Sequence, residues 1–214
     1  MGKKSIEDRI QRLEDVREIE NLMAKYAYLH TAGMHEETAE LFAKKTPGVR
    51  AEIGRLGRWE GTAGINKAMV KNHKFMGVGS PGGLFVHTQT TSVIEVAGDG
   101  KTAKGVWMSP GLETRRNPET GKLIGYWLWG NYGVDFVKED GKWKFWHFHV
   151  YPYIMTPYDK SWTEPTVVAS PPAPDDVKPD RPGTSSNMYS TTAEIEYNPV
   201  PPEPYETFDV KTAY

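Results

Sequence analysis

The stretch Gly125–Tyr153, GYWLWGNYGVDFVKEDGKWKFWHFHVYPY, decides the fold. Two runs rich in aromatic and β-branched residues flank the turn Glu139-Asp140-Gly141, and Asp-Gly between such runs is a strong local signal for a β-hairpin. From Trp143 to Tyr153 the second run is apolar or aromatic at both odd and even positions. An antiparallel strand normally keeps one face in water. Two apolar faces therefore predict that one covers a core or cavity and the other meets helices or another subunit.

The residues before this hairpin predict three helices and several further strands. The capping box Ser5-Ile6-Glu7-Asp8 begins a long amphipathic helix that runs to about Thr31. A short second helix is expected over 35–43, and a third from a cap at Thr62 to about His73. Helices segregated from a meander of strands predict an α+β protein. The strands are expected over 49–56, 58–60, 85–96, 102–108, 123–137 and 143–153.

Composition limits the class of protein. At 214 residues the chain can form one domain of ordinary size with an appendage. Its formal net charge is −2, so no basic excess argues for nucleic acid or a membrane surface as a partner. The absence of cysteine excludes disulfides and favours a cytoplasmic protein. The polar, amphipathic start has neither the apolar region of a signal peptide nor a run long enough to span a bilayer.

The last third of the chain differs in composition from the rest. Twelve of the 16 prolines lie from Pro152 onward, which is typical of a disordered tail. Regularly spaced aromatic residues instead favour an extended arm that packs on its own body or on a neighbouring subunit. We therefore expect a domain over 1–154, an arm over 155–214, and a dimer or trimer with the arm at the interface. The aromatic residues are Tyr158, Trp162, Tyr189, Tyr197, Tyr205, Phe208 and Tyr214.

Three short motifs in this order of elements carry a family resemblance. They are Tyr26-Ala27 near the end of the first helix, ELFA over 40–43 in the second, and DGKWKF over 140–145 at the last hairpin. Over about residues 5–154 the chain resembles the SnoaL-like branch of the nuclear transport factor 2-like superfamily. The resemblance implies a cone-shaped α+β barrel, with a strongly curved, mostly antiparallel sheet around a pocket. It implies no single reaction, because the fold hosts dehydratases, isomerases, cyclases, aldol-type lyases and binding domains.

The resemblance also suggests catalytic residues. Against the dehydratases of this family, the catalytic aspartate falls on Thr31 and the adjacent tyrosine on His30. One catalytic histidine falls on His87, in LFVHTQ, and a second falls near Glu113. An imidazole beside a carboxylate is a workable acid/base pair, because the negative charge holds a proton ready for transfer. The competing interpretation of His87 is a core histidine that is hydrogen-bonded to the backbone.

Other side chains are candidates for orienting a substrate. The pocket asparagine of the family falls on Tyr132 when the Asp-Gly turn is held in place, with Asn131 one residue away. A one-residue slip of a strand exchanges its two faces, so either residue can face the pocket. Tyr28 and His30 lie two apart on a helix and point to different faces, and His30 continues the apolar stripe.

The hairpin and the short strands hold weaker candidates. His147 and His149 share one strand face, and with His87 or Glu113 they can form a zinc or iron site. A role in binding substrate or lining a subunit interface is favoured over metal. Three tryptophans either pack in the core or line a cavity for a flat aromatic substrate. Two arginines either lie on the solvated surface or form a clamp that binds an anion. These residues are Trp107, Trp127, Trp129, Arg55 and Arg58.

Together these patterns predict a lyase that needs no cofactor or metal and acts by acid/base catalysis on a hydroxylated aromatic molecule. His87 is the expected acid/base, with Glu113 or His30 as its partner. Absence of the dehydratase aspartate favours retro-aldol carbon–carbon cleavage, or an isomerisation, over elimination of water. The ending PPEPYETF, over 201–208, resembles long-tailed SnoaL-like proteins of aromatic-degrading bacteria, which suggests formaldehyde release from a diaryl-propanoid. The alternatives are a noncatalytic binding or assembly module and a polyketide-type isomerase or cyclase.

Overall fold

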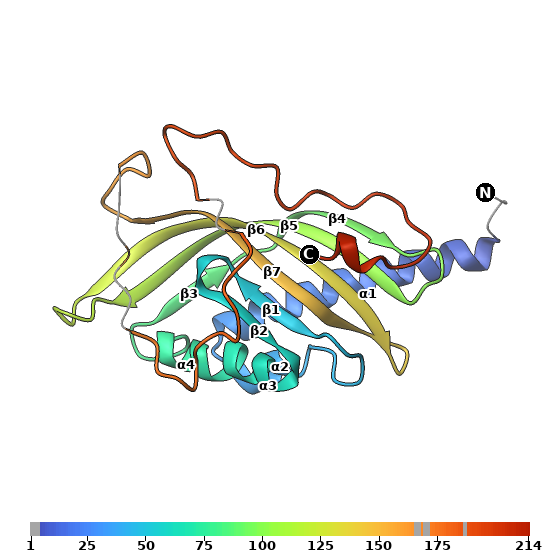
Figure 1. Ribbon diagram of the computed structural model, residues 1–214, viewed down its shortest axis with the longest axis horizontal. Helices are drawn as coiled ribbons and strands as arrows, with labels where there is room; N and C mark the ends of the chain where they lie inside the picture. The colour runs from blue at the N-terminus through green and yellow to red at the C-terminus, as the bar shows by residue number, and fades with distance from the viewer. Residues whose placement is uncertain (1–4, 165–167, 169–171, 186–187) are drawn as a thin grey trace.

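The structure is a computed structural model that describes residues 5–164, 168, 172–185 and 188–214. Its helices lie against one side of a single sheet (Figure 1). Over 172–185 the C-terminal arm first passes the strand Gly57–Glu60 and the helices, and over 198–214 it then runs over the other side of the sheet. The helices are α1 (Ile6–Thr31), α2 (His35–Ala39), α3 (Gly61–Asn66) and α4 (His73–Met76), with a π-helical turn over Lys67–Asn72. The strands are β1 (Arg50–Ile53), β2 (Gly57–Glu60), β3 (Leu84–His87), β4 (Thr90–Val96), β5 (Thr102–Arg116), β6 (Leu123–Glu139) and β7 (Lys142–Pro157).

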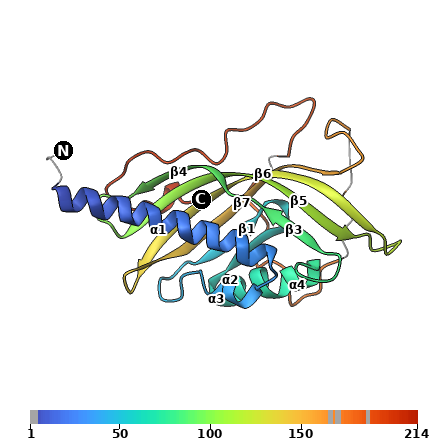
Figure 2. The ribbon, with the colours of Figure 1, turned by 180° about the vertical axis from the view of Figure 1, so that it is seen from behind.

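Helix α1 begins and ends where its sequence predicts. Ser5 Oγ accepts from the backbone N–H of Asp8, and the Asp8 carboxylate accepts from the backbone N–H of Ser5. The helix crosses the face of the sheet, and its first turns project beyond the sheet (Figure 2). Ile10 and Leu13, expected on the buried stripe, are therefore exposed, whereas the stripe from Ile19 onward is buried. The third helix begins at Gly61 without a side-chain cap, so the predicted cap at Thr62 is wrong.

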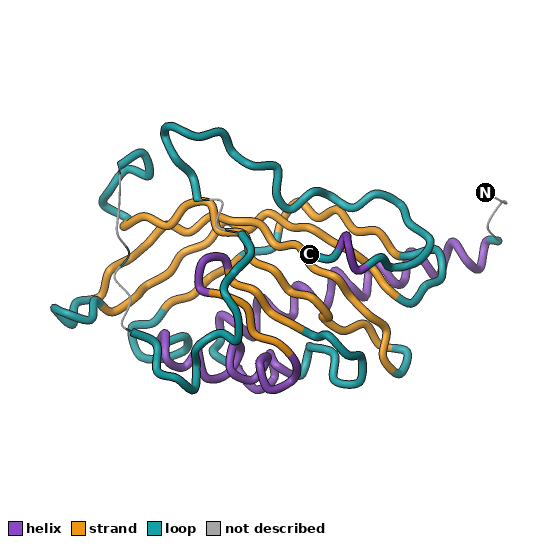
Figure 3. The backbone as a smooth tube through the Cα atoms, viewed as in Figure 1, coloured by secondary structure: helices purple, strands orange, loops and turns teal. Residues whose placement is uncertain are grey.

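The protein has the predicted α+β architecture, but its sheet is not closed into a barrel. Its strand order is β2-β1-β7-β6-β5-β3, and β4 also pairs with β5. All of these pairs are antiparallel except β1 with β7. The predicted barrel is therefore wrong, because the end strands β2 and β3 do not pair with each other. The long central strands curve strongly, and helices fill their concave side (Figure 3).

The β6–β7 hairpin forms as predicted, but its pairing register shifts twice, between Asp135 and Phe136 and between Trp129 and Gly130. Asp140 and Gly141 have φ values of 50° and 75°, as a tight two-residue hairpin turn requires. Asp135 pairs with His147 while Phe136 pairs with Phe145, so Trp146 is the extra residue of a β-bulge. The bulge exchanges the two faces of β7 beyond it. We refer below to the helix-facing side as the inner face and to the opposite side as the outer face.

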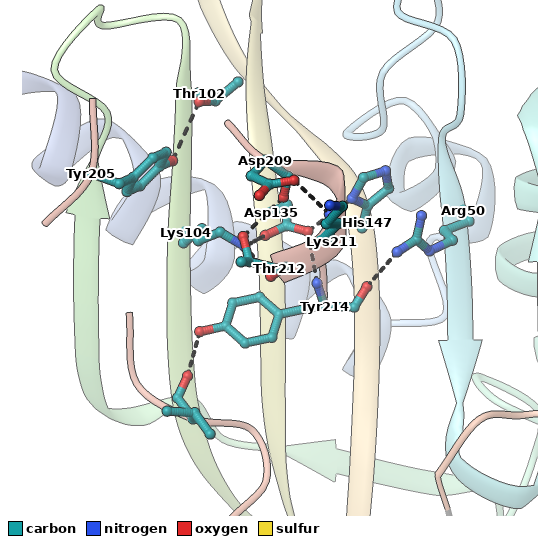
Figure 4. A network of polar contacts seen from close by, with 11 residues as sticks. Arg50, Thr102, Lys104, Asp135, His147, Tyr205, Asp209, Lys211, Thr212 and Tyr214 are labelled. Carbon is teal, nitrogen blue, oxygen red and sulfur yellow. Dashed lines mark hydrogen bonds and ion pairs between the residues drawn. The ribbon is translucent and has the colours of Figure 1, made fainter. Parts of the chain in front are cut away.

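The last part of the C-terminal arm, over 198–214, packs on the outer face of its own chain. The backbone N–H of Gly98 donates to the carbonyl of Tyr205, and further down the arm the residues around Tyr214 lie over a buried polar network (Figure 4). In that network Asp135 accepts from Lys104 Nζ at 2.8 Å and from the backbone N–H of Tyr214 at 2.9 Å. Homo-oligomerisation through the arm stays a prediction. No described helix is both long and apolar enough to cross a bilayer.

Candidate active site

A cavity of about 470 Å³ lies between helices α1 and α4 and the inner face of the sheet. Its wall is largely apolar, and its polar groups gather on one side. A pocket of this size, with few polar groups in an apolar wall, is typical of a small-molecule site. The polar and aromatic lining residues are Tyr26, His30, His73, Phe85, His87, Glu113, Arg115 and Tyr132, and the aliphatic ones include Ile53, Leu128, Val150, Pro152 and Met155.

His87 is the centre of the polar side. It ends β3 opposite Gly111 of β5, where a side chain would collide with the carbonyl oxygen of Val86. His87 Nε2 lies 3.1 Å from Glu113 Oε1, and His87 Nδ1 lies 3.0 Å from the Tyr132 hydroxyl. The predicted pairing of His87 with Glu113 is therefore present. The alternative between Tyr132 and Asn131 is decided for Tyr132, which faces the cavity.

Electrostatics fixes the proton positions in this row. Burial opposes ionisation of Glu113, but the hydrogen bond from His87 and the charge of Arg115 outweigh it and lower the Glu113 pKa to about 2. Arg115 Nε donates to Glu113 Oε2 at 2.6 Å. An ionised carboxylate only accepts hydrogen bonds, so the proton of neutral His87 is on Nε2. Burial raises the pKa of Tyr132, whose hydroxyl stays protonated and donates to Nδ1.

His30 supplies a second imidazole to the cavity. It lies one turn after Tyr26 on α1, is 3% exposed, and stacks on the Tyr26 ring at 5.6 Å. Its ring centroid is 5.0 Å from that of His87 and 4.6 Å from that of His73. Burial, and then the neighbouring imidazoles, hold the pKa of His30 well below its usual value. His30 is therefore neutral, and neither of its ring nitrogens has a hydrogen-bond partner among the described residues.

Two residues of this site were not predicted from the sequence. His73 begins α4 and is buried, and its apolar helical stripe was the signal that it faces inward. Arg115 follows Glu113 by two residues on β5, so both side chains share the inner face. Strand periodicity could have identified Arg115 once Glu113 was placed in the pocket.

Several predicted site residues lie elsewhere. Tyr28 is 81% exposed, so its expected place in the pocket is wrong. Asn131 is on the outer face, where its amide donates to the Tyr153 hydroxyl. Trp129 is also on the outer face and is 46% exposed, while Trp107 packs against Phe136 and does not line the cavity. Strand register explains the corrections for Asn131 and Trp129, because neighbours along a strand face opposite sides, whereas Tyr28 lies on the exposed side of α1.

The strand histidines are separated from the cavity by the sheet. His149 Nε2 lies 3.1 Å from Ser185 Oγ of the arm and 3.3 Å from Glu52, both on the outer face. His147 binds Asp135 there. The zinc or iron site that was considered from His147 and His149 with His87 or Glu113 is therefore not assembled. Among the described residues no three His, Asp or Glu side chains are grouped as metal ligands. The side chain of Arg55 lies outside the described part of the chain, and Arg58 binds Glu60.

An open, curved sheet with a long helix on its concave side and an apolar cavity between them defines a class of α+β proteins, the nuclear transport factor 2-like class. The profile of the SnoaL-like domain matches residues 11–149, and the chain belongs to this family. A comparison with curated protein sequences gives no match.

Solved structures share the fold at low sequence identity. A putative scytalone dehydratase from Novosphingobium aromaticivorans is 21% identical, with a TM-score of 0.58 over 76% of this chain and 99% of that one. LinA is 15% identical, with a TM-score of 0.60 over 77% and 99%. Hexachlorocyclohexane dehydrochlorinase LinA-type3 from Novosphingobium barchaimii is 18% identical, with a TM-score of 0.55 over 77% and 99%. At these identities the comparisons establish the fold alone.

Proposed function

We propose that this protein is a cofactor-independent lyase that acts by acid/base catalysis on a hydroxylated aromatic small molecule. The observation that carries the proposal is the buried row Glu113–His87–Tyr132, with contacts of 3.1 and 3.0 Å, at the wall of an apolar cavity. The wall of Phe85 and aliphatic side chains suits an aromatic ring, and the row suits its hydroxyl groups. The dehydratase and dehydrochlorinase with this fold are named for eliminations, which supports the same class of chemistry.

Each residue of the row has a distinct role in this proposal. Glu113 orients His87 and stabilises the imidazolium that forms when His87 takes a proton on Nδ1. Tyr132 keeps its proton, and when substrate binds its hydroxyl turns from His87 Nδ1 to a substrate oxygen where negative charge develops, which frees Nδ1 to take the proton. His30, neutral and without a hydrogen-bond partner among the described residues, accepts from a second substrate hydroxyl. A substrate that fills this partly open, apolar cavity displaces water and so strengthens these interactions, because less water screens them.

Two reactions use the same groups. In retro-aldol cleavage, the base removes the proton of a hydroxymethyl group, the carbon–oxygen bond becomes a carbonyl, and the adjacent carbon–carbon bond breaks. Its electron pair moves onto the carbon that bears the aromatic system, which then takes a proton, and formaldehyde is released. In elimination, the base removes a C–H proton, a carbon–carbon double bond forms, and the leaving hydroxide takes a proton to become water. Absence of the family's aspartate, with Thr31 in its place, supports the first reaction.

The test is turnover of a panel of phenolic diols and diaryl-propane diols. Formaldehyde is trapped and quantified, and new conjugation is followed by absorbance. We expect His87→Gln and Glu113→Gln to reduce kcat/KM by at least about 100-fold. His149→Gln, a buried histidine variant on the outer face, is the matched control and should retain activity. A folded His87→Gln protein that turns over a confirmed substrate at the wild-type rate overturns the proposal.

Two other outcomes assign a different function. Saturable binding of a diol with no change in its mass, absorbance or chromatographic retention indicates a noncatalytic binding module. A product of unchanged mass but altered retention indicates an isomerase or cyclase. Mass spectrometry therefore separates the three classes, since only a lyase product loses formaldehyde or water.

A further inference from the structure

Four of the six histidines form one continuous row inside the protein. The ring centroids of His35 and His73 are 6.0 Å apart, those of His73 and His30 are 4.6 Å apart, and those of His30 and His87 are 5.0 Å apart. The four residues come from four elements: α2, α4, α1 and β3. Separate parts of the sequence therefore converge to place imidazoles side by side.

The row connects the cavity with the surface. At its inner end His87 binds Glu113. At its outer end His35 is 5% exposed and begins α2, next to Glu36. Glu36 in turn pairs with Lys74 at 2.5 Å, and both of these side chains are more than half exposed. His35 does not line the cavity, so the described structure gives it no contact with a substrate there.

The row also holds ring nitrogens that lack hydrogen-bond partners. Both nitrogens of His30 and Nδ1 of His35 are buried and unpaired among the described groups. Buried polar atoms are nearly always hydrogen-bonded, so unpaired ones require an explanation. An imidazole can accept a proton on one nitrogen and release one from the other, directly or through a single bridging water. Unpaired nitrogens along a row of imidazoles fit proton transfer between neighbours.

We propose that His73 and His35 conduct protons between the solvent and the His30–His87 pair. In each step a neutral ring accepts a proton on one nitrogen, becomes an imidazolium, and loses the proton on its other nitrogen to the next ring. No electrons are exchanged and no other reactant is needed. A transfer in the opposite direction restores the original tautomers. His35 is thus a relay residue that acts through the others.

The purpose of the relay rests on the proposed lyase function. In both proposed reactions His87 takes one proton and gives one back, so it is left in the wrong protonation state only when product leaves before the return transfer. The cavity is partly open, and a substrate that fills it separates His87 from bulk water, which leaves the row as its route for proton exchange. Burial, with the neighbouring histidines, lowers the pKa of His73 to about 3. His73 is therefore neutral at rest at pH 7.

The first experiment needs no substrate. In protein labelled with ¹⁵N-histidine, exchange of the imidazole N–H protons of His73 and His30 with water is measured by saturation transfer. We expect His35→Leu to slow this exchange at least about fivefold, because the outer step of the relay is lost. Lys74→Gln is the matched control at the same corner and should change nothing. Backbone amide exchange in α1 monitors local opening, and unchanged imidazole exchange in folded His35→Leu overturns the proposal.

The second experiment uses a substrate confirmed in the diol panel. His35→Ala should lower kcat and leave KM unchanged, and imidazole added to the buffer should restore kcat. A merely structural role for His35 would not respond to added imidazole. If the wild type turns over none of the diols, the lyase function fails, while the water-exchange measurement still decides whether the relay exists.

Discussion

Stability should fall as the pH is lowered from neutral, because buried histidines stay neutral only in the folded chain. His73 gives the magnitude. Its folded pKa of about 3 lies below the ~6.5 expected of an unfolded histidine. The unfolded state therefore binds the proton first as the pH falls. The stabilisation is complete above pH ~6.5 and is lost progressively below it, toward the folded pKa. Between pH 7.5 and 5.5 the loss from this one residue is about 1.4 kcal/mol.

The substitution His73→Gln isolates the contribution of His73 to the pH dependence of stability, because it removes the titrating imidazole. Wild type and variant are unfolded with urea at pH 7.5 and at pH 5.5, and the free energies of unfolding are compared. The variant is expected to be less stable at pH 7.5 because packing changes. Its loss between the two pH values should nevertheless be about 1.4 kcal/mol smaller than that of the wild type. His149, whose pKa burial lowers to about 4, remains in both proteins and cancels.

The comparison has a clear refutation. If both proteins lose the same free energy of unfolding between pH 7.5 and 5.5, His73 titrates in the folded chain as it does in the unfolded chain. The histidine row would then be accessible to water, and the burial argument would be wrong. Amide exchange in α4 at both pH values checks that the wild type has not opened locally before global unfolding.

Three further perturbations test the cavity and the outer face. Tyr132→Phe keeps the ring but removes the hydroxyl that donates to the His87 imidazole. The free energy of unfolding in urea should fall by about 1 kcal/mol, and kcat/KM should fall too. An unchanged kcat/KM would contradict the role of the hydroxyl. Asp135→Ala leaves a buried ammonium unpaired, so a loss of about 3–5 kcal/mol is expected, with faster amide exchange over 199–214. Leu128→Trp should fill the cavity and abolish binding of a fluorescent phenol, whereas Trp129→Leu, on the outer face, should not.

Much of the fold is determined locally and can be predicted from sequence. The capping box at Ser5 and the Asp140-Gly141 turn specify where a helix begins and where a hairpin reverses, because each acts through neighbouring backbone groups. The α+β class follows from the order of helical and strand periodicity. The pairing of His87 with Glu113 was also predicted, through a family resemblance that aligns strands of one fold.

The geometry of the site depends on contacts between distant parts of the chain. The bulge at Trp146 reverses which face of β7 is inner, and alternation in the sequence does not show it. Register between β5 and β6 selects Tyr132 over Asn131, since a shift of one residue exchanges the faces. The histidine row and the open sheet likewise exist only after four elements have packed. The hairpin over Gly125–Tyr153 thus follows from local sequence. Tertiary packing decides what its two faces bind, because the residues that pack on each face come from parts of the chain that are distant in sequence.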